Sequence, residues 1–164
     1  MALEATPLSV ASDGNLLVAF VPSGSNPLSV AILAGATTKA ITYSLTPAGF
    51  NRATTQDTIN DERLTLVQLL EQAGRVKETL DVEYVFGDTG DVAKVALVEG
   101  VAGFIVARYA IPNATAWTVA QKVDVIPIKC GKQAKSAPTA NGVFTIKQKL
   151  FVTGSVTTDG VLVA

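Results

Sequence analysis

The sequence predicts a mainly β fold whose long strands suit a large barrel or sheet, and two observations carry the β prediction. Apolar and polar residues alternate along several runs, most clearly in 143–153, as a half-buried strand requires. In that run Phe144, Ile146, Leu150 and Val152 share one face, and Thr145, Lys147, Lys149 and Thr153 share the other. Helical periodicity is confined to one short stretch near residue 91. The length of 164 residues suits a single domain, 1–164, in which 1–28 is a possible N-terminal arm.

Runs rich in β-branched and aromatic residues predict the individual strands. The expected strands are 16–21 (unless it belongs to the arm), 29–33, 39–45, 63–71, 75–86, 101–110, 123–128, 143–153 and the closing 161–164, with 154–160 as a turn. The clearest hairpin joins 63–71 to 75–86 through a turn at 72–74. In its second strand, Val76, Leu80, Val82, Tyr84 and Phe86 face the core, and Arg75, Lys77, Thr79, Asp81 and Glu83 face away.

Residues 46–62 are polar and follow neither the strand nor the helix period, which predicts a long inter-strand loop. It is either a surface loop or an arm that becomes ordered against another subunit. In the second case the expected contact residues are Arg52, Gln56, Asp57, Asp61 and Glu62.

The stretch after Asp91 predicts one flanking α-helix that ends near Gly100. An Asp or Thr at 88–89 would cap it, and Val92 and Val95 would pack on a sheet. Its β-branched content leaves a strand as the alternative.

Charge is sparse and segregated along the chain. Charged residues make up 16% of the chain and apolar residues 48%, which predicts that copies of the protein cover part of its surface. Ten acids and four bases lie in 57–99, whereas 122–150 holds six lysines and one acid. These opposite blocks predict a contact between subunits through a basic patch, the alternative being two solvated faces. The patch consists of Lys132, Lys135, Lys147 and Lys149.

The composition argues against catalysis and against metal or cofactor binding. Histidine is absent, and no phosphate-binding loop or CxxC motif occurs. The single cysteine, Cys130, is expected to be a small buried residue at a strand end. The longest apolar run, Leu16–Val21, is too short to span a bilayer, and no secretory signal is recognised. We therefore expect no membrane anchor and assembly in a reducing cytoplasm.

Three segments carry a family resemblance: QDTINDERL (56–64), VDVIPIKCGKQAKSAPTAN (123–141) and IKQKLFVTGSVTTDGVLVA (146–164). They resemble the major tail protein of long, non-contractile-tailed actinobacterial phages. The resemblance implies a tail tube subunit, a β-sandwich with a flanking helix. Hexameric rings of such subunits stack into a tube, whose inner β-barrel conducts the genome. It also implies that the loop at 46–62 contacts the adjacent ring.

The resemblance implies partners and a location as well. The expected partners are further copies of the chain, the tape measure and tail terminator proteins, and double-stranded DNA that passes without specific binding. The expected location is the virion tail, assembled in the host cytoplasm. Asp81 and Glu83 are then expected to face the lumen, because a DNA conduit should not bind phosphates; the alternative is the tube exterior. The rival functions are a neck or tail-completion ring protein and a monomeric β-sandwich binding module.

Overall fold

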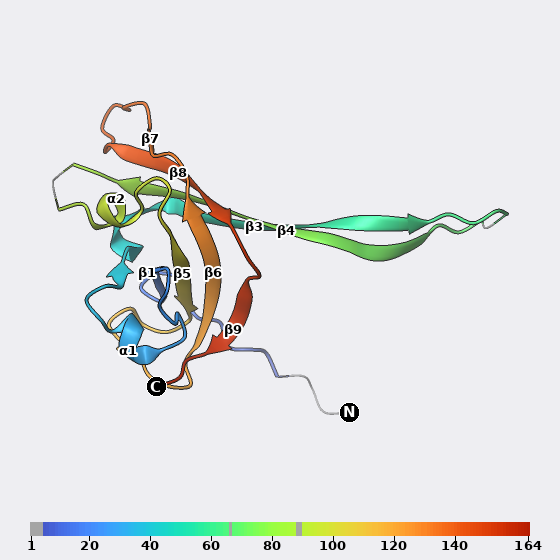
Figure 1. Ribbon diagram of the computed structural model, residues 1–164, viewed down its shortest axis with the longest axis horizontal. Coiled ribbons are helices and arrows are strands. Elements are labelled where there is room, and N and C mark those ends of the chain that lie inside the picture. Colours follow the sequence, from blue (N-terminus) through green and yellow to red (C-terminus); the bar gives the residue numbers. More distant parts are fainter. Residues whose placement is uncertain (1–4, 66, 88–89) are drawn as a thin grey trace.

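The computed structural model describes residues 5–65, 67–87 and 90–164. Its strands form one continuous sheet in the order β2-β1-β5-β6-β8-β4-β3, with β7 paired to β8 and β9 paired to β6. The sheet curls around a core, and a two-stranded ribbon projects from the body, as Figure 1 shows. The expectation of a mainly β fold is confirmed.

The elements follow one another along the chain as mostly antiparallel strands with short helices between them. In order they are β1 (Leu16–Pro22), α1 (Val30–Leu33), β2 (Lys39–Ala40), the 3-10 helix η1 (Thr42–Ser44), β3 (Leu45–Asp61), β4 (Leu70–Val85), α2 (Val92–Ala96), β5 (Ala102–Tyr109), β6 (Lys122–Cys130), β7 (Ala134–Lys135), β8 (Thr145–Val152) and β9 (Thr157–Val161). Four expected strands are confirmed: 16–21, 101–110, 123–128 and 143–153 correspond to β1, β5, β6 and β8.

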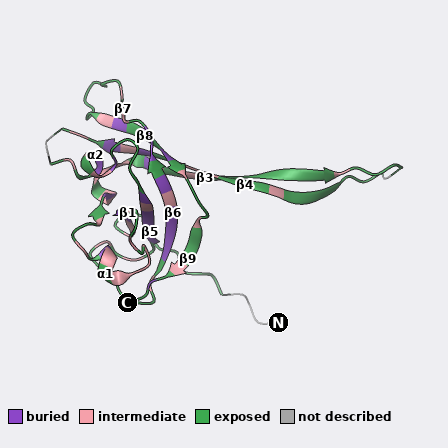
Figure 2. Cartoon of the chain, viewed as in Figure 1, coloured by how far each residue is buried: buried purple, intermediate pink, exposed green. Residues whose placement is uncertain are grey.

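Apolar residues are buried on both faces of the centre of the sheet. The larger core lies inside the curl and includes Leu80, Tyr84 and Ile126, all fully buried. The smaller core lies on the other face, where α1 and the C-terminal segment cover Val106 and Val123. Figure 2 shows the buried residues gathered on the central strands, while the ribbon is exposed. Each fully buried side chain of this size contributes about 1.5–3 kcal/mol to the free energy of unfolding. Most of the stability of the fold therefore comes from the body and not from the ribbon.

The alternation expected in β8 is confirmed at Ile146 and Leu150, which are buried, and at Lys147 and Lys149, which are exposed. Phe144 departs from it, because it precedes the strand and is exposed. A glutamine, Gln148, occupies the core position between the two buried aliphatic residues.

The prediction of a loop at 46–62 is wrong, because this stretch is strand β3 and pairs with β4 along most of its length. The sequence shows no apolar alternation here because residues 53–60 are exposed on both faces, which removes the pattern that burial imposes. Cross-strand backbone hydrogen bonds and a threonine-rich sequence hold the strand instead. The long inter-strand connection runs from 62 to 69, of which residues 62–65 and 67–69 are described.

The expected turn at 72–74 is also wrong. Gly74 lies inside β4, at a register shift where β4 has one more residue than β3 between the pairs Gln56–Val76 and Thr58–Ala73. A Cβ at Gly74 would lie 2.6 Å from the carbonyl oxygen of Asp57. The glycine therefore permits a bulge in which the backbones of β3 and β4 approach closely. Because glycine is also typical of turns, the sequence pattern predicts a turn instead.

Three further strand or turn predictions are corrected. Residues 29–33 form the short helix α1 in place of a strand, with the amide of Val30 donating to the Val163 carbonyl at 2.9 Å. In 39–45, residues 39–40 form the strand β2 but 42–44 form η1, and 154–160 includes the start of β9. In each case contacts with distant segments override local propensity, and α1 covers the smaller core with Leu33.

The flanking helix is confirmed as α2, but a different face is buried from the one expected. Ala93 and Leu97 pack in the larger core, whereas Val92 and Val95 are exposed. Side-chain amides set this orientation, because the Nε2 atoms of Gln133 and Gln148 both donate to the Leu97 carbonyl, at 3.1 and 2.7 Å. The helix begins after Asp91 as N-cap, and the capping residues expected at 88–89 lie outside the described residues. No helix of the described residues is long and apolar enough to cross a membrane.

Candidate assembly interface

The ribbon consists of residues 52–61 of β3, residues 70–79 of β4 and the connection between them, described at 62–65 and 67–69. It extends away from the body on the side opposite α2 (Figure 1). Residues 53–60 are all exposed, including the predicted contacts Gln56 and Asp57. An isolated two-stranded ribbon gains little from burial, so such a projection is typical of a surface that another molecule covers.

The outer end of the ribbon carries exposed apolar side chains beside acids. We call residues 57–71 the ribbon tip; among the residues described there, the large exposed apolar side chains are Ile59, Leu64, Val67, Leu69 and Leu70. The tip contains four acids and one arginine, a net charge of −3. Arg63 hydrogen-bonds Asp61, with Nη2 2.9 Å from Oδ2, and this bond raises the pKa of Arg63.

Arg52 lies at the base of the ribbon and joins it to the body. Its Nη1 donates to Asp124 Oδ2 on β6 at 2.6 Å, and its Nε donates to Glu78 Oε2 at 3.3 Å. The other oxygen of Asp124 accepts the Asp159 amide at 2.9 Å. Partial burial pulls the pKa of Arg52 down, but the hydrogen bonds to the two carboxylates outweigh it and the pKa is raised. Arg52 thus has partners in its own chain, which compete with the contact to another subunit predicted for it.

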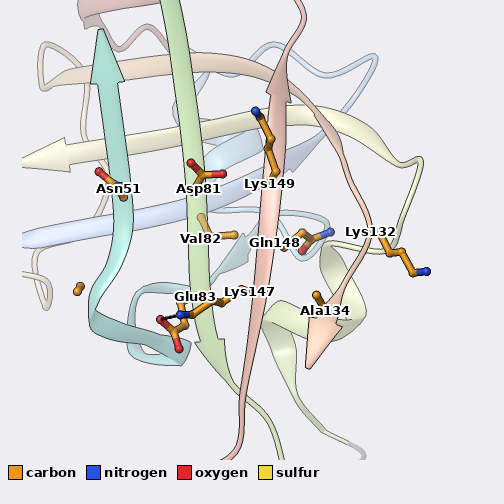
Figure 3. A pocket seen from close by; sticks show the side chains of 10 residues that line it. Asn51, Asp81, Val82, Glu83, Lys132, Ala134, Lys147, Gln148 and Lys149 are labelled. Atoms are coloured by element: carbon orange, nitrogen blue, oxygen red, sulfur yellow. Dashed lines mark ion pairs between the residues drawn. The ribbon is translucent and has the colours of Figure 1, made fainter. Parts of the chain in front are cut away.

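On the outer face of the sheet, β4 carries two acids and the neighbouring β8 carries two lysines. Asp81 pairs with Lys149 and Glu83 with Lys147 in the strand register. Lys147 Nζ is 3.9 Å from Glu83 Oε2, and Thr145 donates to Glu83 Oε1 at 2.7 Å. Figure 3 shows these residues around a shallow depression of about 390 Å³. We call Asp81, Glu83, Lys147 and Lys149 the charged face.

The charged face unites two groups of residues that the sequence assigned to different surfaces. Directly paired residues of neighbouring strands project to the same side of a sheet. Lys147 and Lys149, predicted at a subunit interface, therefore share one surface with the predicted lumen residues Asp81 and Glu83. Any environment that one pair meets in an assembly, the other pair meets too.

The other two predicted lysines lie outside the strand pairs of this face. Lys132 is exposed and is among the residues that line the same depression (Figure 3). Lys135 lies in β7 with its Nζ 5.4 Å from the centre of the Phe86 ring, a cation–π contact. Lys132 and Lys135 have no ion pair among the described residues, and neither has Lys149, so Lys147 is the one lysine of the predicted patch with an ion pair there.

Two buried polar residues of the body were not singled out from the sequence. Arg108 in β5 is fully buried and donates to the carbonyls of Pro112, Thr115 and Ala116 at 2.9–3.3 Å. Burial lowers the pKa of Arg108, and its guanidinium stacks on Trp117, with 4.7 Å to the ring centre. In the sequence, Arg108 lies on an alternating strand that is followed by a long loop, which places a charged residue at a buried position. The sequence does not show which loop carbonyls the guanidinium contacts.

The second is Gln148, which is satisfied on all sides. Its Oε1 accepts the Tyr84 hydroxyl at 2.9 Å, and its Nε2 donates to the carbonyls of Leu97 and Gly131. Burial, with a smaller effect of Cys130, raises the pKa of Tyr84, so this hydroxyl remains a donor. The network ties α2 to the sheet beneath the charged face.

The candidate interface thus consists of the projecting ribbon, the charged face and the ion pairs of Arg52 that join the ribbon to the body. No group of three or more potential metal-ligating side chains lies in the part of the chain that the structure describes. A family model for the phage tail tube protein matches residues 3–164. The chain belongs to the phage tail tube protein family. This is a family of structural tail proteins and not of enzymes, so the protein is a structural component of the virion tail.

The fold of this tail tube protein is also similar to a solved structure. A chain of the anti-feeding prophage baseplate, determined by cryo-electron microscopy with six-fold symmetrisation, matches with a TM-score of 0.59 and 12% identity. The match covers 94% of this chain and 98% of the other. No curated protein sequence matches this chain. The resemblance to tail proteins found in the sequence is confirmed.

Proposed function

We propose that this protein assembles into hexameric rings that stack into a hollow tail tube, through which the phage genome passes. The observation that carries the proposal is the ribbon, a long paired projection on a member of the tail tube family. The symmetry of the baseplate that contains the similar fold supports six subunits in a ring. A heterologous contact repeated by rotation closes a ring, and the same chain can stack such rings.

The open edge of the sheet supports the joining of strands between subunits. Among the described residues β3 pairs with β4 alone, so its other edge is free to pair. Strand addition to such an edge provides main-chain hydrogen bonds without any change of fold. Six copies joined in this way make a continuous barrel, and the charged face of β4 and β8 then lines either its lumen or its exterior.

We place the charged face in the lumen, with Asp81 and Glu83 as the acids that DNA meets. Since Lys147 and Lys149 lie beside them, the lining has alternate signs and little net charge. Such a surface neutralises few phosphates, releases few counterions and holds DNA weakly, as a conduit requires.

The ribbon is proposed to contact the adjacent ring through Gln56, Asp57, Asp61 and Glu62. Lys132 and Lys135 are proposed to meet acids of a neighbouring subunit. The tape measure and tail terminator proteins are the further partners expected of a tube, and assembly is placed in the host cytoplasm.

Negative-stain electron microscopy of the concentrated pure protein tests the proposal. Tubes of stacked rings are the expected result. Single rings that never extend would favour a neck or tail-completion protein instead. Persistent monomers at all concentrations would contradict the proposal and favour a monomeric binding module.

A further inference from the structure

A groove on the body lies beside α2, on the side opposite the ribbon. It has a volume of about 430 Å³ and is lined by Phe20 and Pro22 of β1 together with Val92, Val95 and Ala96. Lys39 of β2 lies at the same groove. The exposure of Val92 and Val95 is the feature that the sequence did not predict, because helix spacing placed both against the sheet.

We propose that this groove receives the ribbon tip of a second copy of the chain. The inference rests on the proposed function and deepens it, since it names the surface on which the ribbon ends. The tip and the groove match in two independent ways, in apolar character and in charge.

The apolar match is between side chains that water surrounds in the single subunit. Leu64 and Val67 at the tip are almost fully exposed, and Val95 in the groove is 66% exposed. Apolar patches of this kind on a structural protein mark surfaces that become covered. Valine and leucine side chains inserted beside α2 remove apolar surface from water on both partners.

The charge match sets the orientation. The tip has a net charge of −3, with Glu62 and Glu71 exposed. Lys39 at the groove is exposed and has no ion pair among the described residues; its Nζ donates to the Ala36 carbonyl. Complementary charges across an interface steer the encounter and suppress wrong registers.

The geometry makes the contact intermolecular and repeating. The ribbon leaves the body on one side and α2 lies on the other, so a tip cannot fold back into its own groove (Figure 1). A contact between different surfaces of identical copies is heterologous, and each copy added leaves one free tip and one free groove. This is the property that a polymer of rings needs.

Disulfide trapping between two single-cysteine-addition variants tests the inference. Tagged Val67→Cys protein is mixed with untagged Val95→Cys protein under mild oxidation, and the tagged–untagged dimer is measured on a non-reducing gel. The native Cys130 is 2% exposed and does not compete. Val119→Cys, at a position of similar exposure outside the groove, replaces Val95→Cys as the matched control. We expect at least about ten times more mixed dimer with Val95→Cys than with Val119→Cys.

A charge at the groove provides the second arm. Val95→Glu should raise the protein concentration needed for assembly by about ten-fold or more, because a carboxylate would meet an acidic, apolar tip. Val119→Glu should leave that concentration unchanged.

The outcomes separate this inference from the proposed function. Tubes without the 67–95 disulfide, or tubes of Val95→Glu at the normal concentration, overturn the groove and leave the tube proposal standing. A specific 67–95 disulfide in protein that forms neither rings nor tubes supports the groove and contradicts the tube. Unlinked monomers contradict both.

Discussion

Arg108 is a buried cation that meets carbonyl oxygens and an aromatic ring in place of an acid. Its guanidinium gathers the carbonyls of Pro112, Thr115 and Ala116, so it holds the 110–121 loop against β5. Its Nε atom has no hydrogen-bond partner in the part of the chain that the structure describes. The group remains charged because arginine has the highest pKa of the side chains, so burial lowers the value without removing the charge.

Replacement of Arg108 by methionine should destabilise the fold without touching any assembly surface. Met fills a similar volume but leaves several carbonyls without a donor, which costs roughly 2–4 kcal/mol of the free energy of unfolding. Urea denaturation measures the loss. Arg63→Met, at an exposed ion pair, is the control and should not move the urea midpoint. Equal midpoints for both variants would show that the carbonyl contacts contribute nothing.

Cys130 is a second residue whose environment decides its chemistry. Burial raises the pKa of its thiol to about 11 from the ordinary 9.0. Two pKa units make the reactive thiolate about 100 times scarcer at pH 8 than in an unfolded chain. Maleimide labelling of the folded protein should therefore be at least about 100-fold slower than labelling in urea. Equal rates would place the thiol at the surface.

The same pKa shift predicts a loss of stability in alkali. The folded state keeps the Cys130 proton up to about pH 11, whereas the unfolded chain loses it from pH 9.0. Stability is therefore complete below pH 9 and falls as the pH rises towards 11. In Cys130→Ala this contribution is absent, so the urea midpoint should fall less steeply over that interval.

At the scale of the element, the ribbon is a separate unit attached to a stable body. Its strands contribute Arg52 to the ion pairs at the base, while none of the tip residues that the structure describes belongs to either core. Truncation can therefore separate assembly from folding.

Replacing residues 57–75 by Asn-Gly would close the hairpin at the Gln56–Val76 pair with a two-residue turn. The body keeps its described buried residues and the Arg52 pairs, so the urea midpoint should stay the same. Electron microscopy should show no tubes, because the tip is missing. Normal tubes from the truncated chain would exclude the ribbon as an assembly element.

At the scale of the whole molecule, the proposed ring repeats every surface charge six times. The double change Asp81→Lys with Glu83→Lys leaves four lysines on the charged face. Four lysines bind the phosphates of passing DNA, so they hold the DNA more tightly than the original face does. Like charges directly across strands cost about 0.2–1 kcal/mol per pair, small enough for tubes to form. Genome release from virions that carry this variant should be slower, whereas Asp81→Asn with Glu83→Gln should change it much less.

Cryo-electron microscopy of assembled tubes decides where this face lies. Side chains of Asp81 and Glu83 on the tube exterior would reject the lumen assignment, whatever the rate of genome release. Their presence in the lumen would place Lys147 and Lys149 there as well, by the register of β4 and β8.

The sequence by itself determined the elements that are half-buried or central. Four of these strands pack against a core: β1, β5, β6 and β8. Because the buried positions of a strand must be apolar, their sequences show the apolar pattern that predicts a strand. The inward face of β4 was predictable at Leu80, Val82 and Tyr84 for the same reason. The family resemblance came from segments that include β6, β8 and the C-terminus.

Three features followed only from the tertiary structure. They are the pairing of β3 with β4 in the ribbon, the face of α2 that is buried, and the grouping of Asp81, Glu83, Lys147 and Lys149 on one face. The ribbon has water on both faces, so no burial pattern marks it, and Gly74 signals a bulge as readily as a turn. The helix α2 faces the sheet through Ala93 and Leu97 because distant glutamines hold its carbonyls. Asp81 and Lys149 lie far apart in the chain, and their pairing follows from strand register alone, which local sequence does not encode.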